Sequence, residues 1–232
     1  MLDRAEFVRR LRSVPQNAPS LRAERKRISK AAAALDRGAV FGLARDLIDA
    51  RVARFVAYEL LLNHKPAFES ITPSEVKKLG GGIGHWGDVD SFACIIAGPA
   101  WRAGNIPDSL IRAWARSGDW CWRRAALVST VPLNSLARGG TGDSKRTLAI
   151  CSILAPDRHD LVVKALSWAL RELAKCDPES VRRFFTTHRE KLAARVIREV
   201  NNKLATGRKN PRTLGFGAAP HARIRPILES DG

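Results

Sequence analysis

The 232-residue sequence lacks long hydrophobic runs. No apolar stretch approaches the roughly 20 residues that span a bilayer, and the first residues, MLDRAEFVRRLRSV, place Asp3 and Glu6 where a signal peptide would have an apolar core. We therefore expect a cytoplasmic, monomeric protein with no membrane contact. The same residues predict a short amphipathic helix whose core-facing side chains are Leu2, Phe7, Val8, Leu11 and Val14.

Motifs of metal, disulfide and nucleophilic chemistry are also missing. The cysteines, Cys94, Cys121, Cys151 and Cys176, form no CxxC pair and have no Cys/His ligand spacing. They indicate reduced core thiols and neither a zinc site nor a disulfide framework. His85 and His188 have no Ser or Cys nucleophile pattern around them, which argues against a hydrolytic triad.

Strand-like alternation is almost absent, whereas apolar positions recur every three or four residues through most of the chain. This spacing predicts an all-α protein. Candidate N-caps precede several apolar runs, and Pro178 stands at a first helical position. The predicted caps are Asp88, Asp108, Asp119, Asp143, Asp157 and Asp177, and Gly98, Gly118 and Gly207 follow helix-like runs.

Four segments share a loose similarity, in which a basic residue leads into a small-plus-aliphatic helix: RFVAYELL, RRAALVST, KALSWALREL and ARVIREVNNKL. Their intervals include one of about forty residues, the period of HEAT-type helix pairs. We expect a right-handed α-α superhelix of HEAT-like repeats with a concave groove over residues 1–207, and an ordinary helical bundle is the alternative. Residues 208–232 are rich in Pro, Gly and basic side chains and predict a flexible basic tail.

Basic residues strongly outnumber acidic residues, which gives a formal net charge of +17 and a pI near 10.8. Such an excess of Lys and Arg repels itself unless a polyanion binds. A nucleic acid is the leading partner, and ribosomal, anionic-membrane and merely solubilising roles remain alternatives.

The predicted helix over residues 160–175 has a buried stripe made of Val162, Ala165, Leu166, Ala169, Leu170 and Leu173. Its opposite face carries Lys164, Trp168, Arg171 and Lys175. A Trp among cations suits a surface that meets a phosphate backbone together with a sugar or base. The alternative is that Trp168 packs beneath a neighbouring repeat.

The segment DWCWRRAALVST, residues 119–130, leaves almost no polar face and predicts a buried helix that nevertheless contains Arg123 and Arg124. A buried charge needs a partner carboxylate or an opening onto an anion. Either one arginine pairs internally while the other reaches a phosphate, or both belong to structural ion pairs.

The stretch GGGIGHWGDVDSF, residues 80–92, has no following Lys-Ser/Thr and no preceding strand, so we expect a compact turn and not a nucleotide loop. Asp88 is the predicted N-cap of a helix over residues 89–97 with the stripe Val89, Phe92, Ala93 and Ile96. Asp90 lies in the first turn, and Trp86 precedes it by four residues. Of the other tryptophans, Trp114 is predicted in the core and Trp101 in an inter-helix turn.

Together, HWGDVDSFA, WCWRRAALVS, KALSWALRELAK and REVNNKLATGRKNPR resemble the DNA alkylation repair family typified by AlkD, over roughly residues 20–212. The family's W-x-x-x-D pattern falls on Trp86 and Asp90, its W-x-x-R pattern on Trp120 and Arg123, and the tryptophan of KA-x-x-W on Trp168. The typical pattern does not include the glycine run or the basic tail.

The resemblance implies a nucleoid-associated glycosylase that removes N3- or N7-alkylated purines from duplex DNA without a cofactor. It assigns catalysis to Asp90, Trp86 and Trp168 and a phosphate contact to Arg123. Arg124, Lys164, Arg171 and Lys175 complete the expected DNA-binding set. Because some relatives bind DNA without excising bases, a non-catalytic module for damaged or branched DNA, or for RNA, is the alternative, and a protein-interaction scaffold ranks last.

Overall fold

The computed structural model describes residues 4–210, and all regular secondary structure within that range is helical, as predicted. The N-terminal part contains α1 (Arg4–Ser13), α2 (Ala18–Ala32), α3 (Arg37–Asp49), α4 (Arg54–Asn63), α5 (Lys65–Glu69) and α6 (Pro73–Leu79). The middle contains α7 (Trp86–Phe92), the π-helical turn η1 (Ala93–Ala97), α8 (Gly98–Arg102), α9 (Asp108–Ala115), α10 (Trp120–Val128), α11 (Val131–Asn134) and the 3-10 turn η2 (Leu136–Arg138). The C-terminal part contains α12 (Ser144–Leu154), α13 (Asp160–Leu173), α14 (Pro178–His188), the 3-10 turn η3 (Arg189–Lys191) and α15 (Ala194–Thr206).

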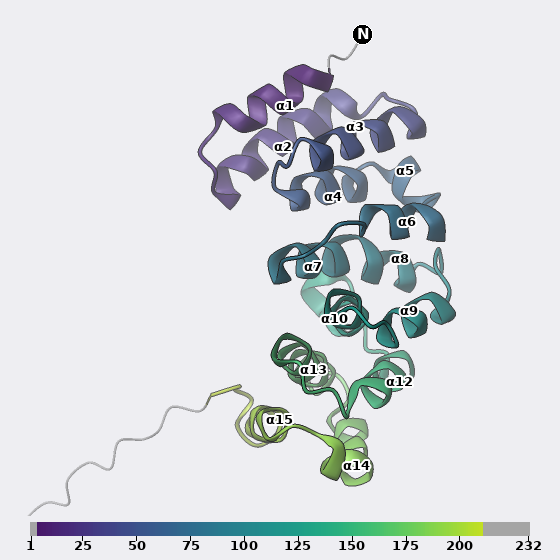
Figure 1. Cartoon of the computed structure of the whole chain (residues 1–232), viewed down its shortest axis with the longest axis vertical. Coiled ribbons are helices and arrows are strands. Elements are labelled where there is room, and N and C mark those ends of the chain that lie inside the picture. Colours follow the sequence, from purple (N-terminus) through teal and green to yellow (C-terminus); the bar gives the residue numbers. More distant parts are fainter. Residues whose placement is uncertain (1–3, 211–232) are drawn as a thin grey trace, which may run out of the picture.

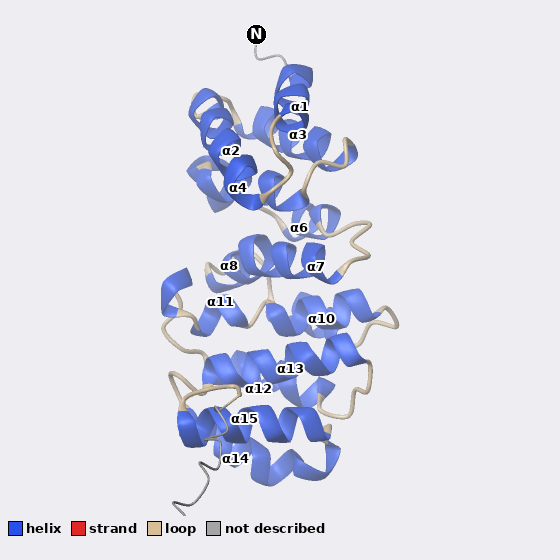
Figure 2. Cartoon of the chain, turned by 90° about the vertical axis from the view of Figure 1, so that its left-hand side faces the viewer, coloured by secondary structure: helices blue, strands red, loops and turns tan. Residues whose placement is uncertain are grey.

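The helices follow one another along the long axis of the molecule in chain order (Figure 1). The helices α2, α4, α7, α10, α13 and α15 lie on the left-hand side of that view, and α3, α5, α9, α12 and α14 lie on the right. The left-hand outline curves inward at α7 and α10. We call the side formed by α2, α4, α7, α10, α13 and α15 the inner face, and Figure 2 presents it to the viewer.

One continuous apolar core runs between the two rows of helices. The predicted stripe of α7 and η1 is confirmed, since Val89, Phe92, Ala93 and Ile96 are all fully buried. The predicted stripe of α13 is buried in the same way, and Trp114 is a core residue. Removing apolar surface from water stabilises the fold by about 25 cal/mol per Å². This core is therefore the main source of the protein's stability.

The N-terminal helix is also amphipathic as predicted. Phe7 and Leu11 are buried, and Val8 and Val14 pack against the core. Leu2, and the predicted tail except for residues 208–210, lie outside the described residues. None of the helices in the described range combines the length and apolarity that crossing a bilayer requires.

Half of the predicted aspartate caps are confirmed. The side chains of Asp119, Asp143 and Asp177 accept hydrogen bonds from backbone N–H groups in the first turns of α10, α12 and α14. Pro178 is the first residue of α14, and Gly207 ends α15 with a φ of 71°, a conformation that favours glycine.

The other three predicted caps are wrong. His85 caps α7, so Asp88 lies inside the first turn. Asp108 is the first residue of α9 and accepts a hydrogen bond of 2.8 Å from the indole nitrogen of Trp101. Asp157 precedes α13 by three residues; its carboxylate pairs with Arg123 and also accepts a hydrogen bond of 2.8 Å from the backbone N–H of His159, the N-cap residue.

Two further predictions about the middle of the chain need correction. Trp101 lies within α8 and is fully buried, so it is not part of a turn. Gly98 does not end a helix but continues from η1 into α8, where a Cβ would come within 2.7 Å of the carbonyl oxygen of Ser129. The glycine therefore permits close helix packing.

The four cysteines are all free thiols, as predicted. Cys94, Cys121 and Cys151 are buried, whereas Cys176 is exposed, which contradicts its predicted place in the core. Cys176 follows α13 and donates a hydrogen bond of 3.1 Å to the carbonyl oxygen of Asn134. Burial raises the pKa of Cys121 to about 11, so this thiol is a poor nucleophile at neutral pH.

Candidate functional site

Trp86 opens α7 on the inner face and is half exposed, at 50% of its surface. The preceding His85 is the N-cap, and its Nδ1 accepts a hydrogen bond of 3.1 Å from the backbone N–H of Gly87. The two rings lie side by side with 5.2 Å between their centroids. An exposed tryptophan held at a capped helix start presents a ring face to a ligand.

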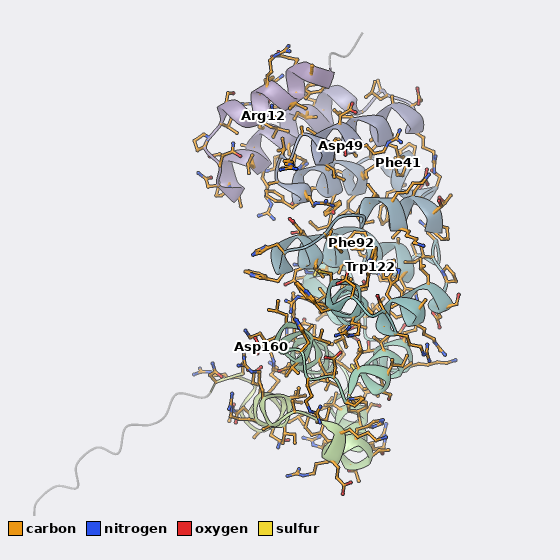
Figure 3. All side chains as sticks on the ribbon, in the orientation of Figure 1. Arg12, Phe41, Asp49, Phe92, Trp122 and Asp160 are labelled. Carbon is orange, nitrogen blue, oxygen red and sulfur yellow. The ribbon has the colours of Figure 1, made fainter. Side chains whose placement is uncertain are left out.

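The glycine-rich turn before Trp86 is compact, as predicted, and the structure gives the reason. A Cβ on Gly80 would lie 2.7 Å from Cη2 of Trp122 and 2.8 Å from Cζ of Phe92. Phe92 and Trp122 lie next to each other in the middle of the molecule (Figure 3), with ring centroids 6.0 Å apart. The absence of a side chain at Gly80 thus lets the turn close on the aromatic core.

Arg54 fixes the same turn from α4. Its guanidinium donates hydrogen bonds of 2.9 Å to the carbonyl oxygen of Gly81 and 3.1 Å to that of Gly82. Tyr58, one turn further along α4, donates a hydrogen bond of 3.0 Å to the carbonyl oxygen of Leu79, and burial raises the pKa of this phenol. The backbone that leads into Trp86 is therefore held at three carbonyl oxygens, those of Leu79, Gly81 and Gly82.

Asp90 lies one helical turn after Trp86 and forms the central ion pair of the inner face. Nε of Arg124 donates to one carboxylate oxygen at 2.8 Å, and Nη2 donates to the other at 2.7 Å. The Arg124 side chain is 7% exposed and that of Asp90 is 18% exposed. Because a carboxylate offers about four lone-pair positions, Asp90 retains acceptor sites on its open side.

The third guanidinium nitrogen of Arg124 donates to the carbonyl oxygen of Leu161. Arg124 belongs to α10, Asp90 to α7 and Leu161 to α13, so this one side chain ties three consecutive inner helices together. The structure gives Arg124 an intramolecular role, and the expected DNA contact of this residue stays a prediction. The arginine that orients Asp90 was not foreseen as its partner.

Arg123 also makes intramolecular contacts. Its Nε pairs with Asp157 at 2.7 Å, and Nη1 donates to the carbonyl oxygens of Ser117 and Gly118 at 3.0 and 2.8 Å. The structure therefore matches the alternative in which both arginines belong to structural ion pairs. A DNA contact by Arg123 stays a prediction.

Trp168 lies on α13 and is partly buried against the core. Its exposure is therefore intermediate between that expected for a surface contact to DNA and that expected for packing beneath a neighbouring repeat. It follows Leu161, which accepts from Arg124, by seven residues, or about two helical turns. Arg124 therefore connects the Asp90 helix directly to the Trp168 helix.

The predicted cations of α13 all have acidic partners. Lys164 pairs with Asp160 at 2.6 Å and Lys175 with Glu172 at 2.8 Å, whereas Arg171 lies 3.8 Å from Glu199. Asp160 points to the inner side of the molecule in Figure 3, and its hydrogen bond with Lys164 lowers the pKa of this carboxyl. The Lys164–Asp160 pair is exposed, and exposed pairs contribute little to stability, so Lys164 can exchange its partner for a phosphate. Glu172 and Glu199 are largely buried, so the pairs of Lys175 and Arg171 belong to the packed structure.

The sequence did not reveal a second aromatic pair at the start of α10. Trp120 stacks on His159, which precedes α13, with centroids 5.1 Å apart and planes 8° apart. The two residues are thirty-nine positions apart in the chain, so only the packing of α10 on α13 brings them together.

Two cavities lie near these helices, but neither is lined by Trp86, Asp90 or Trp168. One of about 970 Å³ lies between α3 and α6, and one of about 390 Å³ lies between α4 and η2. Across residues 4–210, no group of three His, Cys, Asp or Glu side chains is arranged to hold a metal ion. The group available at Asp90 is a mostly buried carboxylate oriented by Arg124, one helical turn from an exposed indole.

A model of a family described as DNA alkylation repair enzyme matches residues 16–204, a range that includes every residue of the site described above. No curated protein matched the chain.

Proposed function

Since the chain belongs to the DNA alkylation repair enzyme family, whose substrate is DNA, we propose that it is an AlkD-like glycosylase. It hydrolyses the N-glycosidic bond of N3- or N7-alkylated purines in duplex DNA. The observation that carries this proposal is the partly exposed Asp90 carboxylate, held by two hydrogen bonds from Arg124 and one helical turn from the exposed Trp86.

The charge of the leaving group explains why a carboxylate is sufficient for base release, with no general acid. An N3- or N7-alkylated purine carries a positive charge, so it leaves without protonation by a general acid. The charge that develops in the transition state lies on the deoxyribose, and fixed groups of opposite sign stabilise it. Asp90 supplies the negative charge and accepts a proton from the attacking water, while Arg124 keeps the carboxylate in place.

The tryptophans stabilise the same sugar cation. Trp86 and Trp168 present ring faces toward the deoxyribose, and a cation–π contact contributes about 0.5–2 kcal/mol depending on desolvation. The turn held by Arg54 and Gly80 fixes the entry angle of Trp86. Because the reacting group is the sugar, no pocket that encloses the base is required.

The proposed architecture is a right-handed HEAT-like superhelix whose inner face forms a concave basic groove for the duplex. Support comes from the chain-order stacking of helix pairs and the inward curve of the inner face (Figure 1). The charge of +17 supplies the sequence-independent attraction to phosphates. A monomer that acts on nucleoid DNA is sufficient for this reaction.

A non-catalytic module for damaged or branched DNA, or for RNA, is the second candidate. The observation that favours it is the full pairing of Asp90 with Arg124, since an ion pair of this kind also serves purely to join helices. It shares the charge and the inner face with the first candidate but predicts no base release.

A comparison of cationic and neutral lesions separates the two candidates and tests the mechanism. The purified protein is incubated with matched duplexes that contain 7-methylguanine, 3-methyladenine or hypoxanthine, and released base is quantified. We expect release of both cationic bases and none of hypoxanthine, because the site has no acid to protonate a neutral leaving group. Equal release of hypoxanthine would contradict the mechanism, and binding without any release would favour the non-catalytic module.

A further inference from the structure

Leu136 is the most exposed large hydrophobic residue in the described part of the chain, at 78% of its surface. It belongs to η2, between α11 and α12, and takes no part in the site around Asp90. Exposing an isobutyl side chain to water has a free-energy cost relative to burying it. A single exposed leucine is ordinary on a mobile loop, so the surroundings of η2 decide its meaning.

The η2 turn is firmly built. Nη1 of Arg102 donates hydrogen bonds of 2.7 Å to the carbonyl oxygens of both Pro132 and Arg138, which brace the turn from either end. Gly140 is packed so tightly that a Cβ would lie 2.4 Å from the carbonyl oxygen of Pro132. Leu136 therefore projects from a fixed support.

The segment that follows η2 is anchored to the core as well. The Asn134 side chain donates 2.9 Å to Oγ1 of Thr147 and accepts 2.8 Å from the backbone N–H of Asp143. Asn134 is buried, so these bonds fix both ends of the η2 segment against α12.

An arginine-lined cavity of about 390 Å³ adjoins the turn. Its charged walls are Arg22, Arg25, Arg102, Arg138 and Glu59, and its apolar walls include Leu62, Ile95, Pro99 and Ala137. Glu59 pairs with Arg22 and Arg25, whereas Arg138 has no ion-pair partner among the described residues. A surface that combines one unpaired guanidinium group, that of Arg138, with apolar walls matches a sugar-phosphate backbone.

This cavity lies beside the proposed active site. Cys94, one helical turn after Asp90, forms part of its lining. Burial raises the pKa of the Cys94 thiol to about 12, and the charges of Arg138 and Asp90 both act on this thiol, with opposite signs. In Figure 2, α11 lies at the left-hand edge of the inner face and the turn before α7 at the right-hand edge. A duplex on this face would therefore meet η2 on one side and Trp86 on the other.

We propose that η2 is a second DNA-contacting element, in which Arg138 binds a backbone phosphate and Leu136 enters the minor groove and opens a base step. This inference rests on the proposed DNA substrate. Apolar side chains on firm supports flanked by arginines unstack base pairs and kink the duplex. A kink at η2 would press the opposite strand against Trp86 and Asp90.

The test uses a short duplex with one 7-methylguanine and with 2-aminopurine placed in turn at each neighbouring position, because the fluorescence of this base rises when it is unstacked. Wild type is expected to raise the fluorescence at one step. Leu136→Ala is expected to abolish that rise and weaken binding roughly tenfold, while Leu136→Met retains both. Arg138→Gln should weaken binding and reduce the slope of log affinity against log salt concentration by about one, the value for one phosphate contact. Arg189→Gln, in the exposed η3 turn, is the control and should change neither.

Folding does not confound the result, because Leu136 is exposed and its replacement removes no core contact. Unchanged affinity and an unchanged fluorescence rise in Leu136→Ala would overturn the proposal, as would the absence of any rise with wild type. Base release is measured in the same samples. Release without a fluorescence rise rejects only the η2 element, and a rise without release rejects only the glycosylase.

Discussion

At the scale of single residues, Asp90 and Arg124 lie at the centre of the account. The sequence placed both residues in the site, through the resemblance and through the anomaly of a charge on an apolar helix. It did not pair them, because they are 34 positions apart and their contact depends on how α7 packs on α10. The pair makes Asp90 an oriented carboxylate and removes Arg124 from the surface.

Arg124→Met tests this positioning role. Losing the guanidinium removes the partner of Asp90 and the side-chain donor to the Leu161 carbonyl. We therefore expect the free energy of unfolding, measured in urea, to fall by roughly 2–4 kcal/mol. Base release should fall at least tenfold in protein that is still folded. Arg146→Met is the matched control, since Arg146 also joins a partly buried carboxylate, Asp143, and a carbonyl oxygen of another helix, that of Trp101, and its loss leaves Asp90 held. Similar base release by the two variants would contradict the role of Arg124.

Gly80→Ala tests why the turn before Trp86 is rich in glycine. The added methyl group would overlap the rings of Trp122 and Phe92, and overpacking of this kind destabilises by about 1–3 kcal/mol. The control is Gly84→Ala in the same turn, where a Cβ would meet no atom within 4 Å. Unfolding curves of both variants give the comparison, and equal stabilities would show that the close packing at Gly80 is unimportant.

At the scale of helices, the sequence predicted the amphipathic elements well and their ends less well. The stripes of α7 and α13 follow from apolar spacing alone, which the core then requires. Asp108 and Asp157 resemble caps in sequence but serve Trp101 and Arg123 in space. Such tertiary contacts compete with local capping, and one sequence does not reveal which contact prevails.

The cap of α14 predicts a pH effect on stability. Hydrogen bonds from Ser144 and Ser180 lower the pKa of Asp177 to about 2. Because the folded-state pKa lies below the unfolded value of about 3.9, the stabilisation is present above pH 4 and is lost as the pH falls toward 2. Asp177→Asn retains a capping side chain but does not ionise. Its unfolding free energy should therefore fall less than that of wild type between pH 4 and pH 2.

Unfolding in urea at a series of pH values measures this difference. Ser144→Ala removes the donor with the largest effect and should shift the pH dependence in the same direction as Asp177→Asn, by a smaller amount. Parallel curves for wild type and Asp177→Asn would refute the assignment to this carboxyl.

At the scale of the whole molecule, an all-helical stack with an inward-curving inner face carries a large positive charge. The spacing of apolar residues was enough to predict the helical class, and the net charge led us to expect a polyanionic partner. The sequence did not show that all five predicted DNA-binding cations hold acidic partners, because these pairs depend on side-chain geometry. Arg138, in a segment that the sequence had not singled out, has no ion-pair partner within residues 4–210.

The central claim is that Asp90 on this inner face performs base excision and does not merely join helices. The most direct measurement is release of 7-methylguanine and 3-methyladenine from methylated duplex DNA by wild type and by Asp90→Asn, with DNA binding measured on the same samples. We expect release by wild type and its near-complete loss in Asp90→Asn, with binding retained. Equal release by the two proteins would contradict the claim.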